Sequence, residues 1–479
     1  MSSDPTVYVK KMLKHLAKSK CSDELDAHYF SEILKAYFVL GRPSHFIQFK
    51  EEILKTYLKI LEHLPIELSF KITHQLFLYV RTNNSVNGDL ENQSEINKRV
   101  LQPFQTNLER MLPSIEVPRL DFNPNKDVYV VITRHAVTQG MYAPGKQIYS
   151  VCDALLKAQK KVILVNFGSQ DEKFLELEKH PRFFLYNCRN DFNSLQSFFE
   201  LRELIGEIKP TEIITEIELS ALNLIEAIGV SSEVCLFSAG FFQTPWFDKK
   251  YIASDLYSED MNTRAGFVEI PQTLSLEILA PSVPVGEVER LRMELSLQDK
   301  FVFGSFARYE MFTEEFLEFA KRALCSVPDS VLILAGTNDQ TVAQSYLAEE
   351  IEQKRVILFG PIKTYVFGWL IDVFLDPFPT VAGFAALESL AKGKPVVTKE
   401  CAGLGNYRKS RVQDLIFEKE NDLLDTLTSM ADCKNMYCRW SEMSKELAAS
   451  FDRSKALADA ICQSPSLQGS STQSVNYAL

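Results

Sequence analysis

The segment Asp372–Thr398 reads DVFLDPFPTVAGFAALESLAKGKPVVT, and it indicates the fold more strongly than any other part of the chain. A short apolar run ends in a turn with two prolines, which a strand cannot cross because proline lacks the backbone donor. Small residues then open a helix, whose first N–H groups and dipole favour a phosphate. Glu388 follows one to two turns later, where its carboxylate can accept both hydroxyls of a ribose. An ordinary strand–helix–strand crossover with a solvated Glu388 explains the same spacing.

The same alternation of apolar strands and amphipathic helices runs through most of the chain. From Val128 onward, uncharged runs such as VYVVIT and VILVNF are typical of strands buried on both faces of a parallel sheet. From about Asp299 the alternation starts afresh with KFVFGSF. Before about residue 112, apolar residues recur three and four positions apart, which predicts helices.

These patterns predict an α/β protein with two Rossmann-like domains that face a cleft, because ligands bind at the carboxyl ends of parallel strands. A length of 479 residues also exceeds what one hydrophobic core usually supports. The predicted parts are an all-helical N-terminal domain at 1–120, a first Rossmann-like (acceptor) domain at 121–298, a second (donor) domain at 299–462 and a disordered tail at 463–479.

Composition narrows the classes of partner. A net charge of −11 argues against general affinity for nucleic acid or an anionic membrane. No apolar run approaches the roughly 20 residues of a membrane-spanning helix, and the N-terminus lacks the apolar core of a signal peptide. The nine cysteines are odd in number and dispersed, which favours buried thiols over a disulfide framework or a zinc site. We therefore expect a cytoplasmic protein without a metal.

The run ALESLAKGKPVV resembles the donor-binding helix of GT-B glycosyltransferases. The resemblance implies that Glu388 holds the ribose of a nucleotide. Gly383, Phe384 and Ala385 stand where related enzymes place side-chain phosphate contacts, so backbone donors are expected to bind the diphosphate there. Retaining members often carry an acidic residue eight positions before the ribose carboxylate. Thr380 occupies that position here, so we expect inversion.

A wider resemblance covers residues 128–410 and concerns the O-GlcNAc-transferase family, including bacterial cytoplasmic enzymes that glycosylate adhesins on asparagine. The matching runs are FVFGSFARYEMFTEEFLEFAKRALCSVPDSVLILAG, RVILFGP and DVFLDPFP, in that order. Upstream, Asp248, Tyr251, Ile252 and Asp255 are similar to a further aspartate- and tyrosine-containing stretch of that family.

Where that family places a lysine for the donor diphosphate, this chain has Met311. Arg308 is the candidate for the missing charge, since a guanidinium group can bind phosphate oxygens. The alternative interpretation is that Arg308 forms an ion pair with Glu310 at the surface. Lys399 opens a basic, glycine-containing loop that is expected over the diphosphate or the base, and a solvated loop is the alternative.

Acceptor-side residues are expected at the strand ends of the first domain. Arg134 and His135 follow the first strand directly, and a histidine titrates in the range useful for activating an acceptor. His135 could equally be satisfied by a neighbouring carbonyl. The segment with Gly140 and Lys146 resembles the acceptor loop of the GT-B fold. The alternative bases, after a later strand, are Glu216 and Glu218.

The resemblance implies transfer of a hexosyl or N-acetylhexosaminyl group from a UDP-sugar to a protein side chain, with inversion. No metal or other cofactor is expected, because helix dipole and arginine can replace a cation. The helical N-terminal domain is predicted to dock the acceptor or a protein partner. Two alternatives remain: a nucleotide-sugar epimerase, and a non-catalytic partner or chaperone of another glycosyltransferase, which Met311 favours.

Overall fold

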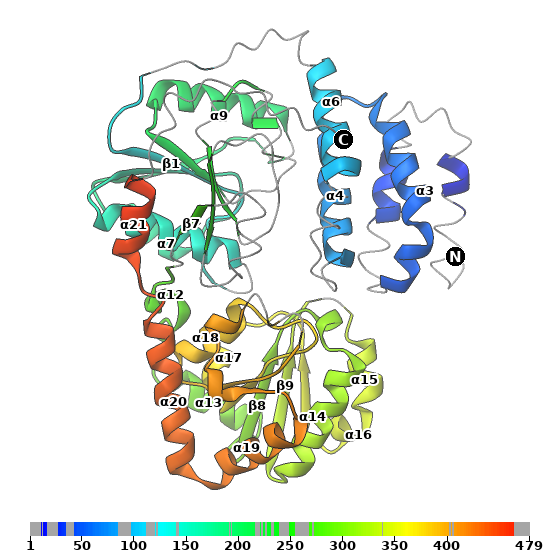
Figure 1. Ribbon diagram of the computed structural model, residues 1–479, viewed down its shortest axis with the longest axis vertical. Coiled ribbons are helices and arrows are strands. Elements are labelled where there is room, and N and C mark those ends of the chain that lie inside the picture. Colours follow the sequence, from blue (N-terminus) through cyan, green and yellow to red (C-terminus); the bar gives the residue numbers. More distant parts are fainter. Residues whose placement is uncertain are drawn as a thin grey trace.

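The computed structural model describes residues 11, 13–16, 27–34, 43–84, 97–111, 120, 123–139, 143–190, 192, 194–215, 221, 224–225, 228–230, 234–238, 249–253, 268–270, 273–337, 339–401, 404 and 407–463. Figure 1 shows two sheet-containing lobes, one above the other, with a group of helices beside the upper one. We call the upper part, which holds strands β1 to β7, the first lobe. The lower part, which holds β8 to β13, is the second lobe.

The first lobe contains a parallel sheet in the order β3-β2-β1-β4-β5-β6-β7. Its first strands start from the centre and step outward before the chain crosses to the other side, which is the doubly wound arrangement. The strand bounds are β1 (Val128–Thr133), β2 (Lys161–Asn166), β3 (Phe183–Asn187), β4 (Glu212–Thr215), β5 (Val234–Ser238), β6 (Lys249–Ala253) and β7 (Val268–Ile270).

Strand β1 is buried on both faces, because successive side chains point to opposite sides of a sheet. Val130 and Ile132 belong to a hydrophobic core shared with α9 (Leu195–Ile208). Tyr129 and Val131 belong to a separate core on the other face. That second core is covered by α7 (Ala143–Lys157) and α21 (Ser454–Gln463).

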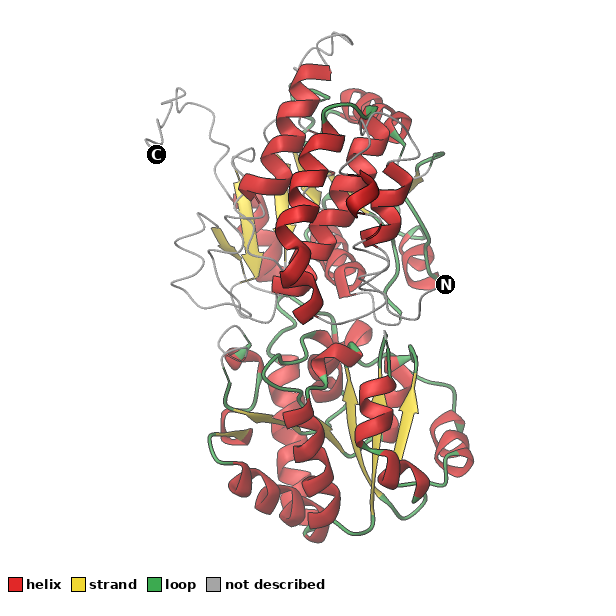
Figure 2. Cartoon of the chain, turned by 90° about the vertical axis from the view of Figure 1, so that its right-hand side faces the viewer, coloured by secondary structure: helices red, strands yellow, loops and turns green. Residues whose placement is uncertain are grey.

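The N-terminal helices pack on the face of the first sheet that carries α9, as Figure 2 shows from the side. Helices α3 (Pro43–Leu61), α4 (Ile66–Asn84) and α6 (Gln102–Met111) contribute to the same continuous core as Val130 and Ile132. Aromatic rings join the two parts: the Phe70 and Phe198 ring centroids lie 5.5 Å apart, edge to face. The residues described before position 112 are helical or form turns between helices.

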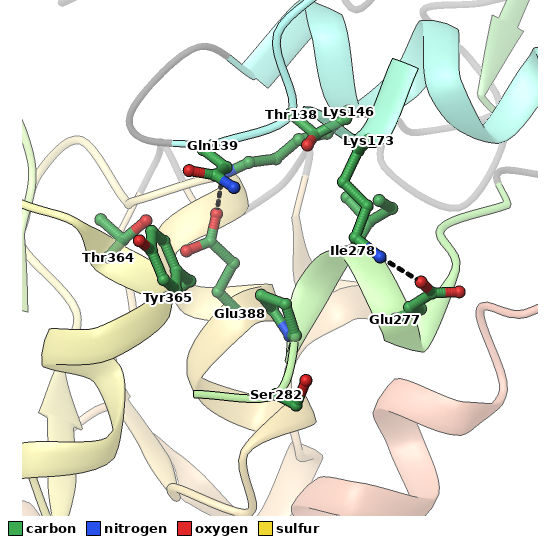
Figure 3. A pocket seen from close by; sticks show the side chains of 11 residues that line it. Thr138, Gln139, Lys146, Lys173, Glu277, Ile278, Ser282, Thr364, Tyr365 and Glu388 are labelled. Atoms are coloured by element: carbon green, nitrogen blue, oxygen red, sulfur yellow. Dashed lines mark hydrogen bonds and ion pairs between the residues drawn. The ribbon is translucent and has the colours of Figure 1, made fainter. Parts of the chain in front are cut away.

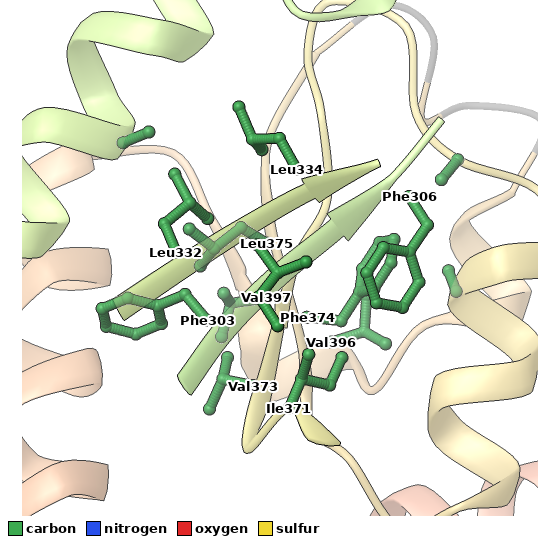
Figure 4. Close-up of a cluster of buried hydrophobic side chains, with 14 of the residues drawn as sticks. Phe303, Phe306, Leu332, Leu334, Ile371, Val373, Phe374, Leu375, Val396 and Val397 are labelled. Atoms are coloured by element: carbon green, nitrogen blue, oxygen red, sulfur yellow. The ribbon is translucent and has the colours of Figure 1, made fainter. Parts of the chain in front are cut away.

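The second lobe repeats the topology with the order β10-β9-β8-β11-β12-β13, again parallel throughout. Its strands are nearly continuous apolar runs, as expected when helices cover both faces, and Figure 4 shows the side chains between them. Their bounds are β8 (Phe301–Phe306), β9 (Ser330–Ala335), β10 (Val356–Phe359), β11 (Val373–Leu375), β12 (Val396–Lys399) and β13 (Ile416–Phe417).

Helices around this sheet include α14, which is amphipathic and capped by a threonine side chain, and α18, which carries the expected ribose carboxylate. The helices of the second lobe are α13 (Glu287–Glu294), α14 (Glu314–Ser326), α15 (Thr341–Tyr346), α16 (Ala348–Glu352), α17 (Thr364–Leu370), α18 (Phe384–Ala391), α19 (Glu420–Asp432) and α20 (Lys434–Ala449).

The chain passes between the lobes twice. It leaves the first lobe through α12 (Leu276–Leu279) and returns after α20, and the two crossings are joined by Leu274 N–H donating to the Phe451 carbonyl at 2.9 Å. Helix α21 then packs on α7 of the first lobe. Assigning all of 299–462 to the second domain was therefore wrong for this last helix. Amphipathic periodicity shows that a helix has an apolar face, but not which lobe buries it.

Two tandem parallel α/β sheets and a helical N-terminal region are confirmed. The sequence did not predict strands β6 and β7, which are short and lack a continuous apolar run. Some predictions concern positions outside the described residues, namely those for Gly140, Glu216, Glu218, Asp248 and Asp255 and for a disordered tail after Gln463. Within the described part of the chain, no helix combines the length and the hydropathy needed to cross a bilayer.

Candidate functional site

A cavity of about 140 Å³ lies where the two lobes meet. The first lobe contributes residues from the loop after β1, from α7 and from α8 (Glu172–Leu177), and the second lobe contributes residues from α17 and α18. The crossing segment around α12 closes one side (Figure 3). The lining residues are Thr138, Gln139, Lys146, Lys173, Glu277, Ile278, Pro281, Ser282, Thr364, Tyr365 and Glu388.

Glu388 reaches this cavity from α18 and is almost completely buried. Its side chain is 5% exposed, and its Oε1 accepts a hydrogen bond from Nζ of Lys146. Its other oxygen, Oε2, has no hydrogen-bond partner among the residues that the structure describes. A buried carboxylate oxygen without a donor costs about 1–3 kcal/mol, so this oxygen is suited to accept a hydroxyl from a ligand.

The Lys146–Glu388 ion pair joins the two lobes. Lys146 lies in the first turn of α7 and is 4% exposed, so both charges of the pair are buried. Figure 3 shows the two side chains meeting across the cavity. The sequence predicted these residues for opposite sides of the cleft, one in the acceptor loop and one on the donor ribose. The structure brings them into direct contact.

The loop after β1 is held in place by Asp171, the N-cap residue of α8. Its carboxylate accepts hydrogen bonds from the hydroxyl of Thr138 at 2.8 Å, from the backbone N–H of Gln139 at 3.0 Å and from the N–H of Thr138. Sequence reasoning missed Asp171. Its signal was available, because β2 neighbours β1 and the loops after adjacent parallel strands meet at one edge of the sheet.

Arg134 and His135 are absent from the residues that line this cavity. Arg134 faces the N-terminal helices: its Nη1 lies 3.1 Å from Nε2 of His74, and its guanidinium lies 5.0 Å from the centre of the Phe192 ring. His135 packs against the loop after β2, where a Cβ at Gly168 would collide with its ring.

The backbone N–H of Ser169 donates to Nδ1 of His135 at 3.2 Å. A neutral imidazole that accepts at Nδ1 carries its proton on Nε2 and can donate there. A base role through Nε2 requires the other tautomer, so this hydrogen bond does not favour the predicted role.

A buried ion pair fixes the turn that leads into α18. Asp376 directly follows β11 and Arg411 comes from the loop after β12; both side chains are 0% exposed and their closest atoms are 2.8 Å apart. Asp376 also accepts from the N–H of Ala382 at 2.8 Å and from the hydroxyl of Thr398 at 3.0 Å. Arg411 in turn donates to the Ala382 carbonyl. The segment 376–382 is therefore held from both ends by one charged network.

Gly383, Phe384 and Ala385 begin α18 immediately after this network and are partly buried. The network thus sets where the N-terminus of α18 lies at the carboxyl edge of the second sheet. Gly383 is the N-cap residue, as the prediction of a helix opened by small residues required.

The cations expected at a diphosphate are engaged elsewhere. Arg308 lies 3.1 Å from a carboxylate oxygen of Glu310, which was the alternative to a phosphate contact. Lys399 donates to Glu315 at 2.6 Å and lies 4.7 Å from the centre of the Phe378 ring. Met311 packs against the hydrophobic core of the second lobe.

Lys392 ties α18 to the crossing segment. Its Nζ donates to the Leu279 carbonyl of α12 at 2.6 Å and to the Glu388 carbonyl at 3.0 Å. Burial lowers the pKa of Lys392 to about 8; the neighbouring Lys146 and Lys394 act in the same direction, and Glu388 opposes them. The helix that carries Glu388 is thereby linked to the segment between the lobes.

This pKa predicts a pH-dependent stability. Between about pH 8 and the unfolded value near 10.4, the unfolded chain binds a proton at Lys392 that the folded chain does not. The free energy of unfolding should therefore rise with pH in this window, by up to about 1.4 kcal/mol per pH unit. Lys392→Met removes this contribution. Urea unfolding of both proteins across the window tests it, and parallel pH curves would contradict the assignment.

The remaining cavity residues that sequence reasoning missed follow strand ends, lie in α8, or lie in and just after α12. Thr364 and Tyr365 come soon after β10, and Lys173 forms an ion pair with Glu277 across the cavity edge. The strand-end position could have indicated the first two. Nothing in the sequence indicates the pair, because it depends on how the crossing segment folds back. Among the described residues, no group of three or more His, Cys, Asp or Glu side chains is placed to hold a metal ion.

No protein-family model matches the chain, and no curated protein matches it in sequence. Solved structures do match. A lysine-to-methionine mutant of the O-GlcNAc transferase of Thermobaculum terrenum superposes with a TM-score of 0.52 at 15% identity, over 96% of this chain and 98% of that one. HepE of Anabaena in complex with UDP-glucose gives 0.50 at 12% identity, over 70% of this chain and 98% of that one.

A glycosyltransferase of Rickettsia africae also gives a TM-score of 0.50 at 12% identity, over 71% of this chain and 97% of that one. At these identities the likeness concerns the fold. Together with the two parallel sheets and the cavity between them, it establishes that the chain has the two-domain GT-B fold, preceded by a helical N-terminal domain.

Proposed function

We propose that this chain is an inverting glycosyltransferase that moves a hexosyl or N-acetylhexosaminyl group from a UDP-sugar to a protein side chain. The observation that carries the proposal is the buried carboxylate of Glu388, which presents an oxygen without a partner in a cavity between the lobes. In a GT-B fold, this is the place for the ribose of a nucleotide. The bound HepE ligand, UDP-glucose, makes uridine nucleotides the first to test.

The groups around Glu388 support a nucleotide at this position. The N-terminus of α18 lies four to five residues before Glu388, so its backbone dipole can meet a diphosphate next to the ribose. Figure 3 places the ring of Tyr365 beside Glu388, and an aromatic face of this kind can pack on a nucleobase. These are ground-state contacts, so they concern binding of the donor more than the chemical step.

The acceptor side of the proposal rests on the first lobe. His135 and Glu216 stay the proposed groups for activating the acceptor, and Gly140 stays in the proposed acceptor loop with Lys146. To act as a base through Nε2, His135 must give up the hydrogen bond that its Nδ1 accepts from the Ser169 N–H, so that Nδ1 can carry the proton. With that hydrogen bond in place, Nε2 carries the proton and can only donate. The helical N-terminal domain, which shares its core with the first lobe, is proposed to dock the protein acceptor or a partner.

Glu388→Ala should weaken UDP binding by about 1–3 kcal/mol, roughly 5- to 150-fold, because hydrogen bonds to a charged carboxylate are lost. Isothermal titration of UDP into both proteins measures this. Glu349→Ala, at an exposed position of α16 in the same lobe, is the control and should leave UDP affinity unchanged. An unchanged affinity in folded Glu388→Ala would remove Glu388 from the site.

A thermal-shift screen tests the class of ligand. A ligand that binds only the folded state stabilises it by mass action, so UDP and UDP-sugars should raise the melting temperature more than GDP, CDP and their sugars. Release of UDP on addition of a protein acceptor then tests transfer. Stabilisation by GDP or CDP alone would overturn the choice of nucleotide.

A second candidate is a GT-B protein that binds a nucleotide sugar without transferring it. The observation that favours it is the engagement of Arg308 with Glu310 and of Lys399 with Glu315, together with the packing of Met311 against the core. Binding of UDP-sugar without UDP release in the presence of acceptor proteins would support this candidate. Turnover would exclude it.

A further inference from the structure

A nucleoside diphosphate brings two to three negative charges into the cleft, and those charges need cations or oriented dipoles close by. The second lobe supplies the N-terminus of α18, but its two predicted cations are already paired. Arg308 is held by Glu310, and Lys399 is held by Glu315. A nucleotide bound here therefore needs a further source of positive charge at the cavity.

Lys146 of the first lobe is such a source. Its ammonium group reaches across the interface and contacts Glu388 inside the cavity, although it belongs to the opposite lobe. A lysine that is 4% exposed is stable only with a partner, because taking an ammonium ion out of water costs several kcal/mol. A ligand that carries phosphate can provide such a partner in place of Glu388.

The small size of the cavity is consistent with such a rearrangement. At about 140 Å³ it is smaller than the roughly 300–1,000 Å³ of typical small-molecule sites. Lys146 and Glu388 both line it, so the ion pair occupies part of the space that a ribose needs. Separation of the pair would open more of this space to a ribose.

We infer that Lys146 exchanges partners, holding Glu388 in the structure described here and pairing with the diphosphate once the ribose hydroxyls bind to Glu388. This inference rests on the proposed function, since it takes a nucleoside diphosphate as the ligand. Lys146 would then supply from the first lobe the charge that Met311 does not supply from the second.

The ammonium group of Lys146 would have to move only a short distance along α18. Phe384 at the start of the helix lies four residues before Glu388, which corresponds to about 6 Å along the helix axis. The flexible four-carbon stem of a lysine can swing its ammonium group over such a distance, and its three donors bind phosphate as a point charge. The move would carry Lys146 from the ribose position to the phosphate position.

Binding affinities distinguish this exchange of partners from an ion pair that only holds the two lobes together. In this exchange Lys146 competes with the ribose for Glu388, and it favours only ligands that carry phosphate. Removing its charge should therefore make uridine bind equally well or better, while the added affinity of UDP over uridine shrinks. If Lys146 only held the two lobes together, its replacement would change the affinities for uridine and for UDP by the same factor.

The test is isothermal titration of uridine and UDP into the full-length protein and two variants. Lys146→Gln removes the charge but keeps a side-chain donor for Glu388, which protects folding. Lys157→Gln is the matched control, on the same helix, exposed and paired with Asp153. We expect the UDP-to-uridine affinity ratio to fall about 10- to 100-fold in Lys146→Gln, the range for one charged hydrogen bond, and to stay unchanged in Lys157→Gln.

A salt titration provides a second readout. Pairing of Lys146 with the diphosphate should make UDP affinity depend more steeply on ionic strength in the wild type than in Lys146→Gln, because screening weakens that contact. An affinity ratio equal to that of the wild type would overturn the inference while leaving the proposed function intact. Wild-type protein that binds neither UDP nor uridine would overturn the proposed function itself.

Discussion

Replacing Arg411 by alanine should lower the free energy of unfolding by about 3–5 kcal/mol, because it leaves the buried carboxylate of Asp376 without its cation. Both side chains are completely buried, so the cost of removing the Asp376 carboxylate from bulk water is no longer offset once the guanidinium is gone. The variant also loses the hydrogen bond from Arg411 to the Ala382 carbonyl, which fixes the turn before α18. Urea denaturation monitored by circular dichroism measures the change.

Arg408→Ala is the matched control for this prediction. Arg408 comes from the same loop and pairs with Glu400, but its side chain is 45% exposed. Exposed ion pairs contribute about 0–1 kcal/mol, so this variant should unfold close to the wild type. Similar losses in the two variants would show that the loop as a whole, rather than the buried pair, determines stability.

Lys146→Met should destabilise the fold by a comparable amount, about 3–5 kcal/mol, since it strands the buried Glu388 carboxylate between the lobes. Urea denaturation of the variant and of the wild type measures the change.

The double variant Lys146→Met/Glu388→Leu provides the control for this second prediction. Replacing both members of a buried pair by apolar residues is often neutral or stabilising, so most of the loss should be regained. Unfolding is again followed in urea. A loss below about 1 kcal/mol in Lys146→Met, the range of exposed pairs, would show that the ion pair between the lobes is not buried in solution.

The architecture of the second lobe could be predicted because its strands carry a continuous apolar signal. Phe301–Phe306 and Ser330–Ala335 are uncharged, all their residues except the partly buried Phe301 are buried, and the amphipathic helix α14 separates them. Strand β6 begins with two lysines and β7 has three residues, so neither produces a recognisable strand pattern. Strand β6 pairs with β5 and β7 pairs with β6, so both strands form by extending the sheet beyond β5.

The position of Glu388 could also be predicted, because a strand–turn–helix unit places the end of the strand and the start of the helix in one cleft. The interaction partners of individual side chains could not be predicted. Whether Arg308 meets a phosphate or Glu310 depends on a rotamer, and the contact between Lys146 and Glu388 depends on the distance between two lobes. Hydrophobic periodicity determines neither quantity.

The most direct test of the account is a comparison of UDP with its dideoxyribose analogue, which lacks both ribose hydroxyls, on the wild type and on Glu388→Ala. If Glu388 receives the ribose, the wild type should bind the analogue about 10- to 100-fold more weakly than UDP, and Glu388→Ala should bind the two nearly equally. An equal preference for UDP in both proteins, or no binding of UDP to the wild type, would contradict the account.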